Sequence, residues 1–244
     1  MKKILVIIPA YNEEKSIGRV LRDTMSSFPE ADILVIDDGS TDGTSKEARK
    51  EGTMVVNLPS NMGLGVAIQT GLMFAQERHY EVVIRLDADG QHRPSELKGL
   101  LAPIEKGEAD IVVGSRFLNT NKPTTAIKPD ENEYVPSLAR KIGIRFFSSL
   151  LSLLLGNTVT DPTSGLQAMN RNAINFFARE YPPDYPEIEA RILAYKAGLN
   201  VKEVPSKTFK RLEGRSSITF LKSIYVFSEA FTSCIVGMLR GVMR

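Results

Sequence analysis

Two aspartates separated by a single residue carry the strongest chemical signal in the sequence. Asp87 and Asp89 follow the apolar run Val82–Leu86, which predicts a buried strand. On an extended segment, residues i and i+2 point to the same side, so the two carboxylates should converge where the strand leaves the sheet. Carboxylate oxygens, with the amide of Gln91 as a further ligand, suit Mg²⁺ or Mn²⁺. The pattern predicts a divalent-metal site, and a turn that only caps the next helix is the alternative.

Polar segments also follow two other predicted strands. Pro9–Glu14 comes after the first strand, and Asp37–Thr44 comes after the second. An aspartate in the second segment, such as Asp38, could accept the N–H groups of a nucleobase or the hydroxyls of a ribose, or it could simply cap a turn. A third segment, Asn61–Gly65, opens a predicted helix and could approach a phosphate. It lacks the third glycine of the dinucleotide-binding fingerprint.

Short β-branched runs alternate with helical segments in the first half of the chain. This alternation predicts an α/β fold with a Rossmann-like, mostly parallel sheet and helices on both faces. Such sheets bind ligands outside the carboxyl ends of their strands, where the polar segments would meet. The predicted strands are Ile4–Ile8, Ile33–Ile36, Met54–Val56, Val82–Leu86, Ile111–Val113 and Val201–Val204, and the predicted helices are Glu13–Ser27, Gly43–Glu51, Gly65–Arg78 and Pro94–Lys106.

The second half of the chain is less regular. Residues 119–136 are rich in Pro, Thr, Asn and charge, which predicts a mobile loop. An apolar helix is expected over Ser137–Leu155 and a turn over Asp161–Gly165. The tail from Ile218 onward has an apolar stripe at helical spacing, so an amphipathic helix is expected there. No uncharged apolar run approaches the ~20 residues that span a bilayer.

Composition and charge limit the class of protein. The chain has 244 residues and a net charge of +2, which suits one α/β domain and does not indicate a nucleic-acid partner. Basic residues outnumber acidic ones from Lys196 onward, which favours an anionic surface or a phosphorylated ligand. The single cysteine, Cys234, excludes an internal disulfide and fits a reducing compartment. We therefore expect a cytoplasmic or peripherally attached protein.

Five motifs in a fixed order resemble those of the family-2 glycosyltransferases with the GT-A fold. More narrowly, they look like the polyprenyl-phosphate branch, whose members glycosylate dolichol or undecaprenyl phosphate. The resemblance runs from residue 4 to about 217, which implies a catalytic domain over 1–217 and a helical tail over 218–244 that docks on a membrane or a partner. The motifs are Ile8–Glu14, Asp37–Thr44, Asn61–Gly65, Asp87–His92 and Gly114–Arg116.

The resemblance implies roles at the donor side of the site. Residues that would line the nucleotide-sugar pocket come from the polar segments described above. Asp87, Asp89 and Gln91 would hold the metal on the donor diphosphate. Asp161 would lie near the transferred sugar, and Glu187 aligns with a family glutamate that precedes the segment Glu203–Pro205. The catalytic candidates are Asp89, Asp161 and Glu187, and the nucleotide-sugar candidates are Pro9, Tyr11, Glu13, Asp38 and Asp87.

The acceptor side is expected to use arginines, because a guanidinium binds phosphate through two parallel hydrogen bonds. The candidates are Arg116, Arg140 and Arg211, and surface arginines that flank a core helix are the alternative reading. The chain departs from the family pattern here. It has Ser217 where the family often has lysine. The acceptor helix often carries a serine after its first arginine, and here Arg140 is followed by Lys141–Ile144, which contains none.

The expected chemistry is inversion by direct displacement at the anomeric carbon, with the metal neutralising charge on the nucleoside diphosphate. A lipid phosphate is already ionised and needs no general base. A saccharide acceptor in polysaccharide or cell-wall glycan assembly is the runner-up, and it would need Glu187 or Asp161 as the base. A sugar-1-phosphate nucleotidyltransferase would require a Gly-rich, cationic loop that Pro9–Glu14 does not provide. A non-enzymatic regulator would bind nucleotide without turnover.

The expected partners follow from this reading. They are a nucleotide-sugar donor, a polyprenyl-phosphate acceptor and the cytoplasmic face of a membrane, to which the protein would attach peripherally. A small integral-membrane partner or a homo-oligomer could supply further attachment. The sequence does not select the sugar, the nucleotide or Mg²⁺ against Mn²⁺.

Overall fold

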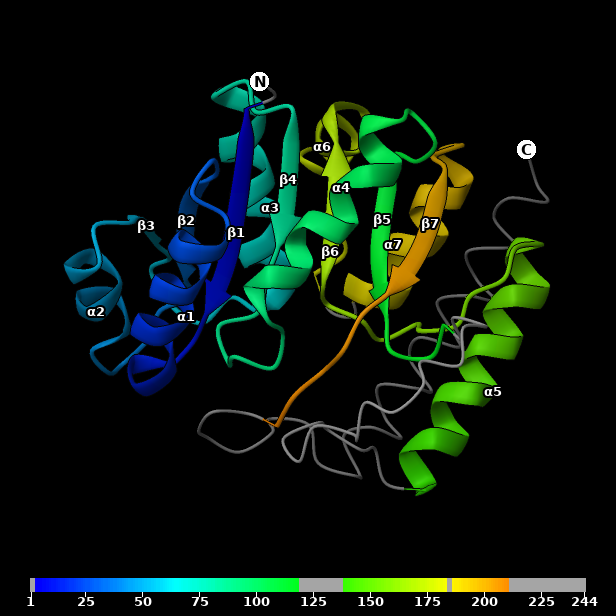
Figure 1. Ribbon diagram of the computed structural model, residues 1–244, viewed down its shortest axis with the longest axis horizontal. Helices are drawn as coiled ribbons and strands as arrows, with labels where there is room; N and C mark the ends of the chain where they lie inside the picture. Colours follow the sequence, from blue (N-terminus) through cyan, green and yellow to red (C-terminus); the bar gives the residue numbers. More distant parts are fainter. Residues whose placement is uncertain (1–2, 119–137, 184–185, 211–244) are drawn as a thin grey trace.

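The computed structural model describes residues 3–118, 138–183 and 186–210, and these residues form an α/β fold built on one sheet (Figure 1). The loop predicted over 119–136 and the helix predicted from Ile218 lie outside the described residues. The described strands are β1 (Ile4–Ala10), β2 (Asp32–Asp37), β3 (Met54–Asn57), β4 (Val82–Arg85), β5 (Ile111–Ser115), β6 (Gln167–Asn170) and β7 (Val201–Pro205). The described helices are α1 (Glu14–Ser27), α2 (Thr44–Lys50), α3 (Leu64–Glu77), the 3₁₀ turn η1 (Pro94–Glu96), α4 (Leu97–Glu105), α5 (Leu138–Leu155), α6 (Arg171–Phe177) and α7 (Pro186–Lys196).

The sheet runs in the order β3-β2-β1-β4-β6-β5-β7 and is mostly parallel, as predicted. All six predicted strands are present. The exception to the parallel arrangement is β6, which pairs antiparallel with both β4 and β5 and was not predicted. Its sequence, Gln-Ala-Met-Asn, has neither β-branched residues nor apolar alternation. Ala168 lies opposite both Ile84 and Val112, so a small side chain fits between two bulky neighbours.

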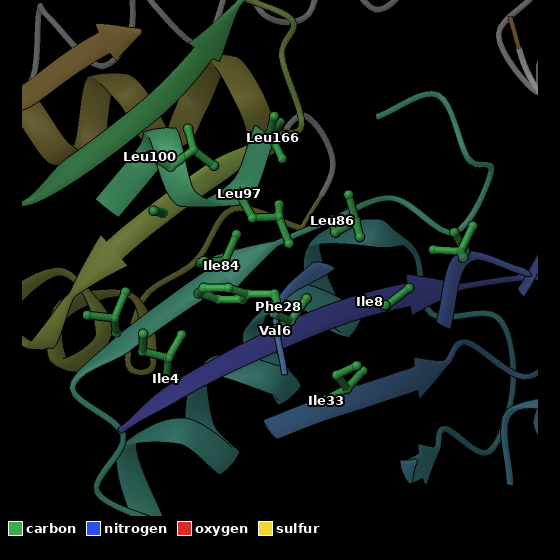
Figure 2. Close-up of a cluster of buried hydrophobic side chains, with 14 of the residues drawn as sticks. Ile4, Val6, Ile8, Phe28, Ile33, Ile84, Leu86, Leu97, Leu100 and Leu166 are labelled. Carbon is green, nitrogen blue, oxygen red and sulfur yellow. The ribbon is translucent and has the colours of Figure 1, made fainter. Parts of the chain in front are cut away.

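Helices cover both faces of the sheet, as predicted. One face packs against α1 and α4, and Figure 2 shows this core, in which Phe28 lies among side chains of β1 and β4. The other face packs against α3, α6 and α7. Every residue of β1 is buried, and its side chains alternate between the two cores, which explains its unbroken apolar sequence.

The carboxyl ends of the parallel strands lie along one edge of the sheet, where the predicted polar segments leave it. Because β6 is antiparallel, it begins at that edge: Gln167 lies opposite Arg85 of β4 and Val113 of β5. The turn that precedes β6 is therefore carried to the same edge as Asp87. This strand direction brings Asp161 and Gly165 to the site.

Helix α5 lies beside the sheet, beyond its β7 edge (Figure 1). Leu151 and Leu155 pack against Val159 and against Ile188 of α7. Other apolar side chains of α5 face outward, and Leu153 is 81% exposed. Within the described ranges, none of the helices has both the length and the apolar character needed to cross a bilayer.

Candidate active site

The segments that follow β1 and β2 are hydrogen bonded to each other. Asn12 has a left-handed backbone (φ 56°), its amide donates to Ser40 Oγ at 2.9 Å, and its Oδ1 accepts from the Thr41 amide at 2.9 Å. The amide of Glu13 donates to Thr44 Oγ1 at 2.8 Å. These cross-links hold both predicted nucleotide segments as one unit. They leave Tyr11 at the rim, 44% exposed.

Asp38 is buried, and its carboxylate organises a neighbouring loop. Its Oδ1 accepts from the Met62 amide at 2.7 Å and its Oδ2 from the Gly63 amide at 3.0 Å. Gly63 has φ +96°, a conformation that suits glycine. Asp38 thus fixes the loop that leads into α3. Its predicted contact with a nucleoside remains a prediction.

Gly65 has a packing role. A Cβ at this position would lie 2.1 Å from the carbonyl oxygen of Pro182 and 2.5 Å from that of Pro183. The loop can therefore approach the segment 182–183 only with glycine at this position. The close approach that the sequence suggested for a phosphate is made here by the protein's own backbone.

The two aspartates of the predicted metal site lie in different surroundings. The extended segment expected to carry them ends at Arg85, and Ala88–Asp89 form a turn that Gly90 closes with φ +73°. The strand therefore ends before both aspartates, so strand alternation does not apply to them, and their convergence on one metal ion stays a prediction. Asp89 is 6% exposed, and its Oδ1 accepts from the Gln91 amide at 3.0 Å. The side chain of Asp87 is 31% exposed.

Arg85 lies behind Asp87 and joins it to Glu187. One nitrogen, Nη2, donates to Asp87 Oδ1 at 3.3 Å and to Glu187 Oε1 at 2.8 Å. Arg85 is 2% exposed, and no hydrogen-bond partner is present for its Nε and Nη1 among the described residues. Burial opposes its charge, but Asp87 and Glu187 outweigh burial and raise the pKa of Arg85 further above neutral pH.

Asp161 is fully buried and paired with Arg116. Nε and Nη2 of Arg116 each donate to one carboxylate oxygen at 2.7 Å, and the Arg116 amide adds a bond at 3.1 Å. Burial alone would raise the pKa of Asp161, but these hydrogen bonds and the charge of Arg116 lower it overall. Two residues predicted for different roles, the transferred sugar and the acceptor phosphate, therefore bind each other.

A second buried ion pair supports the loop that carries Asp161. Arg191 of α7 donates to Glu203 Oε1 at 2.6 Å and to the Asp161 carbonyl at 2.8 Å. Glu203 also accepts from the Thr160 amide at 2.9 Å. The glutamate and arginine that the motifs placed before the Glu203–Pro205 strand thus have different functions: Arg191 holds the loop, and Glu187 faces Arg85.

Gln91 contacts the segment that follows β7. Its carbonyl accepts from the Phe209 amide at 2.8 Å, and its side-chain amide donates to the Phe209 carbonyl at 3.3 Å. Arg93 lies over the Phe209 ring, 3.8 Å from the centroid. The segment therefore reaches the turn that carries Asp89. Arg140 lies in α5, but its side chain is outside the described part of the structure, and Arg211 lies outside the described residues altogether.

A cavity of about 510 Å³ adjoins this turn, between α1 and residues 90–95. It is lined in part by Gly90, His92 and Phe209, but not by any of the predicted nucleotide-sugar residues. The predicted nucleotide-sugar residues therefore lie outside this cavity, and the donor site at the carboxyl ends of the strands stays a prediction. Burial lowers the pKa of His92, which disfavours the charged imidazolium.

The acidic residues at this edge fit a divalent metal that is shared with a diphosphate. Asp87 and Asp89 would supply hard oxygen ligands, and the side chain of Asp87 is accessible. Among the described residues, no group of three His, Cys, Asp or Glu is placed to enclose a metal ion. Mg²⁺ commonly binds through one or two carboxylates and completes its shell with substrate phosphates and water, so two protein ligands suffice.

Sequence reasoning missed two features of the site. Arg85 was not identified as a site residue, although an arginine within an apolar strand is itself a signal of a buried ion pair. The pairing of Arg116 with Asp161 joins residues 45 positions apart, which spacing alone does not reveal.

Comparisons with known proteins agree with this geometry. Residues 5–177 match the model of glycosyl transferase family 2. The UDP-N-acetylglucosamine--dolichyl-phosphate N-acetylglucosaminyltransferase of Methanococcus voltae is 34% identical over 85% of this chain and 86% of its own. The undecaprenyl-phosphate mannosyltransferase of Micrococcus luteus is 31% identical over 89% and 88%. The polyprenol monophosphomannose synthase of Mycolicibacterium smegmatis is 31% identical over 100% and 92%.

A solved structure extends the comparison to the fold. Glucosyl-3-phosphoglycerate synthase from Mycobacterium tuberculosis superposes with a TM-score of 0.71 at 22% identity, over 96% of this chain and 80% of its own. This likeness confirms the GT-A fold that the motifs implied. The family model covers most of the sheet and every predicted donor-side residue except Glu187. The chain therefore belongs to glycosyl transferase family 2 and is a glycosyltransferase.

Proposed function

We propose that this protein transfers a hexose from a UDP- or GDP-linked sugar to a polyprenyl phosphate, with inversion at the anomeric carbon. The observation that carries the proposal is the agreement among three relatives. Each is at least 31% identical over most of both chains, and each is named for a dolichyl, undecaprenyl or polyprenol phosphate product or acceptor. Their names differ in the sugar, so the sugar of this protein is left to experiment.

The geometry of Asp161 supports a phosphate acceptor. A saccharide hydroxyl would need a general base. Asp161 is enclosed, is held by Arg116 through both oxygens and has a lowered pKa, so it is a poor proton acceptor. Glu187, the other candidate base, is engaged in an ion pair with Arg85 at 2.8 Å. A lipid phosphate is ionised at neutral pH and needs cations instead. In this proposal the Arg116–Asp161 ion pair is a rigid structural support on the acceptor side. Arg116, Arg140 and Arg211 are the candidates to bind the phosphate.

On the donor side, we assign Asp87 and Asp89 to a divalent metal, Mg²⁺ or Mn²⁺, with Gln91 beside them. When bound, the ion neutralises the charge that develops on the leaving nucleoside diphosphate. The protein residues on this side position the donor. The cross-linked segments after β1 and β2 present Tyr11 and Glu13 to the nucleoside, and Pro9 lies just before them in the buried end of β1.

We further propose that the protein attaches peripherally to the cytoplasmic face of a membrane. Ile142, Phe146 and Leu153 of α5 are 61%, 57% and 81% exposed, and their spacing places them on one stripe of the helix. Arg145 is exposed between the first two. An apolar stripe beside a cation suits the interface of an anionic bilayer. The tail over 218–244 is proposed as a second attachment.

The proposal is tested by sugar transfer in vitro. The protein is incubated with membranes that contain a polyprenyl phosphate and with radiolabelled UDP-glucose, UDP-N-acetylglucosamine or GDP-mannose, with and without EDTA. Asp89→Asn is compared with Asp110→Asn, because Asp110 precedes β5 at the opposite edge of the sheet and tests for general damage.

EDTA-sensitive label in an organic-extractable lipid, lost in Asp89→Asn and kept in Asp110→Asn, is the expected result. Label in a water-soluble oligosaccharide, with none in lipid, would instead establish the saccharide acceptor. Transfer that proceeds unchanged with EDTA and in Asp89→Asn would overturn the metal assignment.

A further inference from the structure

Arg85 occupies a fixed position at the centre of the sheet. Its backbone pairs with Ile7 of β1 on one side and with Gln167 of β6 on the other. It stands among otherwise apolar residues of β4 and is 2% exposed. A guanidinium at such a place loses its hydration and must be stabilised by the groups that surround it. The carboxylates of Asp87 and Glu187 and the hydroxyl of the buried Tyr181 act on it.

Nη2 of Arg85 bridges two carboxylates that come from different elements. Asp87 belongs to the segment after β4, and Glu187 belongs to the first turn of α7. Both accept from Nη2, at 3.3 and 2.8 Å. Two carboxylates that share one cation lie close together, and they would repel each other without it. The position of each therefore depends on Arg85.

Gly165, in the turn before β6, packs against the contact between Arg85 and Asp87. A Cβ at this position would lie 2.7 Å from Asp87 Oδ2 and 2.9 Å from Arg85 Nη2. The backbone before β6 thus packs directly on the Arg85–Asp87 contact. Asp87 is confined between this backbone and the guanidinium, and its side chain still has 31% of its surface exposed toward the edge of the sheet.

From this arrangement we propose that Arg85 is a positioning residue, which sets the orientation of Asp87 toward the metal and diphosphate and keeps Glu187 beside it. The inference rests on the proposed function, because it takes Asp87 as a metal ligand. Arg85 acts through these two carboxylates and does not itself reach the donor.

A simple counter-charge role predicts the opposite result to a positioning role. If Arg85 only reduced the negative charge of the site, its removal would make the site more negative and strengthen the binding of a divalent cation. If Arg85 positions Asp87, its removal lets Asp87 turn away from Glu187 and weakens that binding. The sign of the change in metal affinity therefore separates the two roles.

The test is a titration with Mn²⁺, followed by the electron paramagnetic resonance signal of the free ion, in the presence of UDP and separately of GDP. Arg85→Gln is expected to lower the affinity for Mn²⁺ by about 10-fold or more, a typical effect of residues that orient metal ligands. Arg85→Lys is expected to lie between Arg85→Gln and the native protein, because lysine keeps the charge but lacks the rigid fork of donors.

Arg171→Gln is the matched control. Arg171 is partly buried and donates to the backbone carbonyls of Tyr80 at 2.8 Å and Gln76 at 3.1 Å, before β4 and away from the carboxyl edge. It should lower thermal stability without changing Mn²⁺ affinity. Unchanged or tighter Mn²⁺ binding in Arg85→Gln would overturn the inference. If Arg85→Gln does not fold by circular dichroism, native affinity in Arg85→Lys would overturn it instead.

Failure of the proposed function would give a different result in the same titration. In that case the native protein itself binds no Mn²⁺ with either nucleotide, and the inference falls with it. When the native protein binds Mn²⁺ and the Arg85 variants bind it equally well, the inference alone is wrong.

Discussion

Arg116 and Asp161 form a bidentate ion pair at the edge of the sheet, with both carboxylate oxygens accepting at 2.7 Å from one guanidinium. The pair joins the end of β5 to the turn before β6, and those two segments carry the predicted acceptor and sugar contacts. The buried position of Asp161 makes this a fixed part of the site. An enzyme whose acceptor is already ionised needs no general base, so the Asp161 carboxylate can serve to hold Arg116 in place.

Asp161→Asn is expected to destabilise the protein by about 3 kcal/mol, because the substitution leaves Arg116 partly buried without its counter-charge. The measurement is the free energy of unfolding in urea. Asp110→Asn, which removes a partly exposed carboxylate, should cost about 1 kcal/mol. A free energy of unfolding that stayed at the native value in Asp161→Asn would contradict this structural role of the Arg116–Asp161 pair.

The stability contributed by Asp161 should depend on pH in a defined direction. Its pKa in the folded protein is lowered below the ordinary value of 3.8, so the unfolded chain binds the proton more readily. The contribution is therefore fully present above the ordinary pKa and is lost as pH falls through the folded pKa. The difference in unfolding free energy between the native protein and Asp161→Asn should be constant from about pH 7 to 5 and shrink below about pH 4. A difference that grows on acidification would contradict this assignment.

The sequence was informative where a pattern is local and less so where partners are distant. All six predicted strands and the polar edge follow from short apolar runs and the segments after them. Strand β6 was not predicted, because its position between β4 and β5 favours the small Ala168, and alanine is not typical of strands. The same strand reverses the chain and brings Gly165 against Asp87. The role of Arg85 depends on that contact and on Glu187, which lies 102 residues away.

Gly165→Ala should impair activity more than stability. The added methyl group would meet the ends of the Asp87 and Arg85 side chains, which can move, and the backbone would stay in place. We expect a fall in kcat/KM of about 100-fold, because a displacement near 1 Å at a reacting centre has an effect of that order. Steady-state kinetics and thermal unfolding are measured together.

Gly99→Ala is the matched control for this substitution. Gly99 lies in α4, and nothing lies within 4 Å of an added Cβ. Alanine favours the helix by up to about 1 kcal/mol, so this variant should be slightly more stable and fully active. A Gly165→Ala variant that loses stability and activity in proportion would contradict a specific displacement of Asp87.

The exposed stripe on α5 is the described surface that we expect to contact lipid. Replacing Phe146 and Leu153 with serine should weaken binding to anionic vesicles by at least 10-fold, because burial of each large apolar side chain contributes about 1.5–3 kcal/mol. Met73→Ser serves as control, since Met73 is 55% exposed on α3, on a separate helix. Vesicle sedimentation measures the binding. Equal losses in the control and the α5 variant would indicate general adhesion, and native binding by the α5 variant would assign the attachment to another part of the chain.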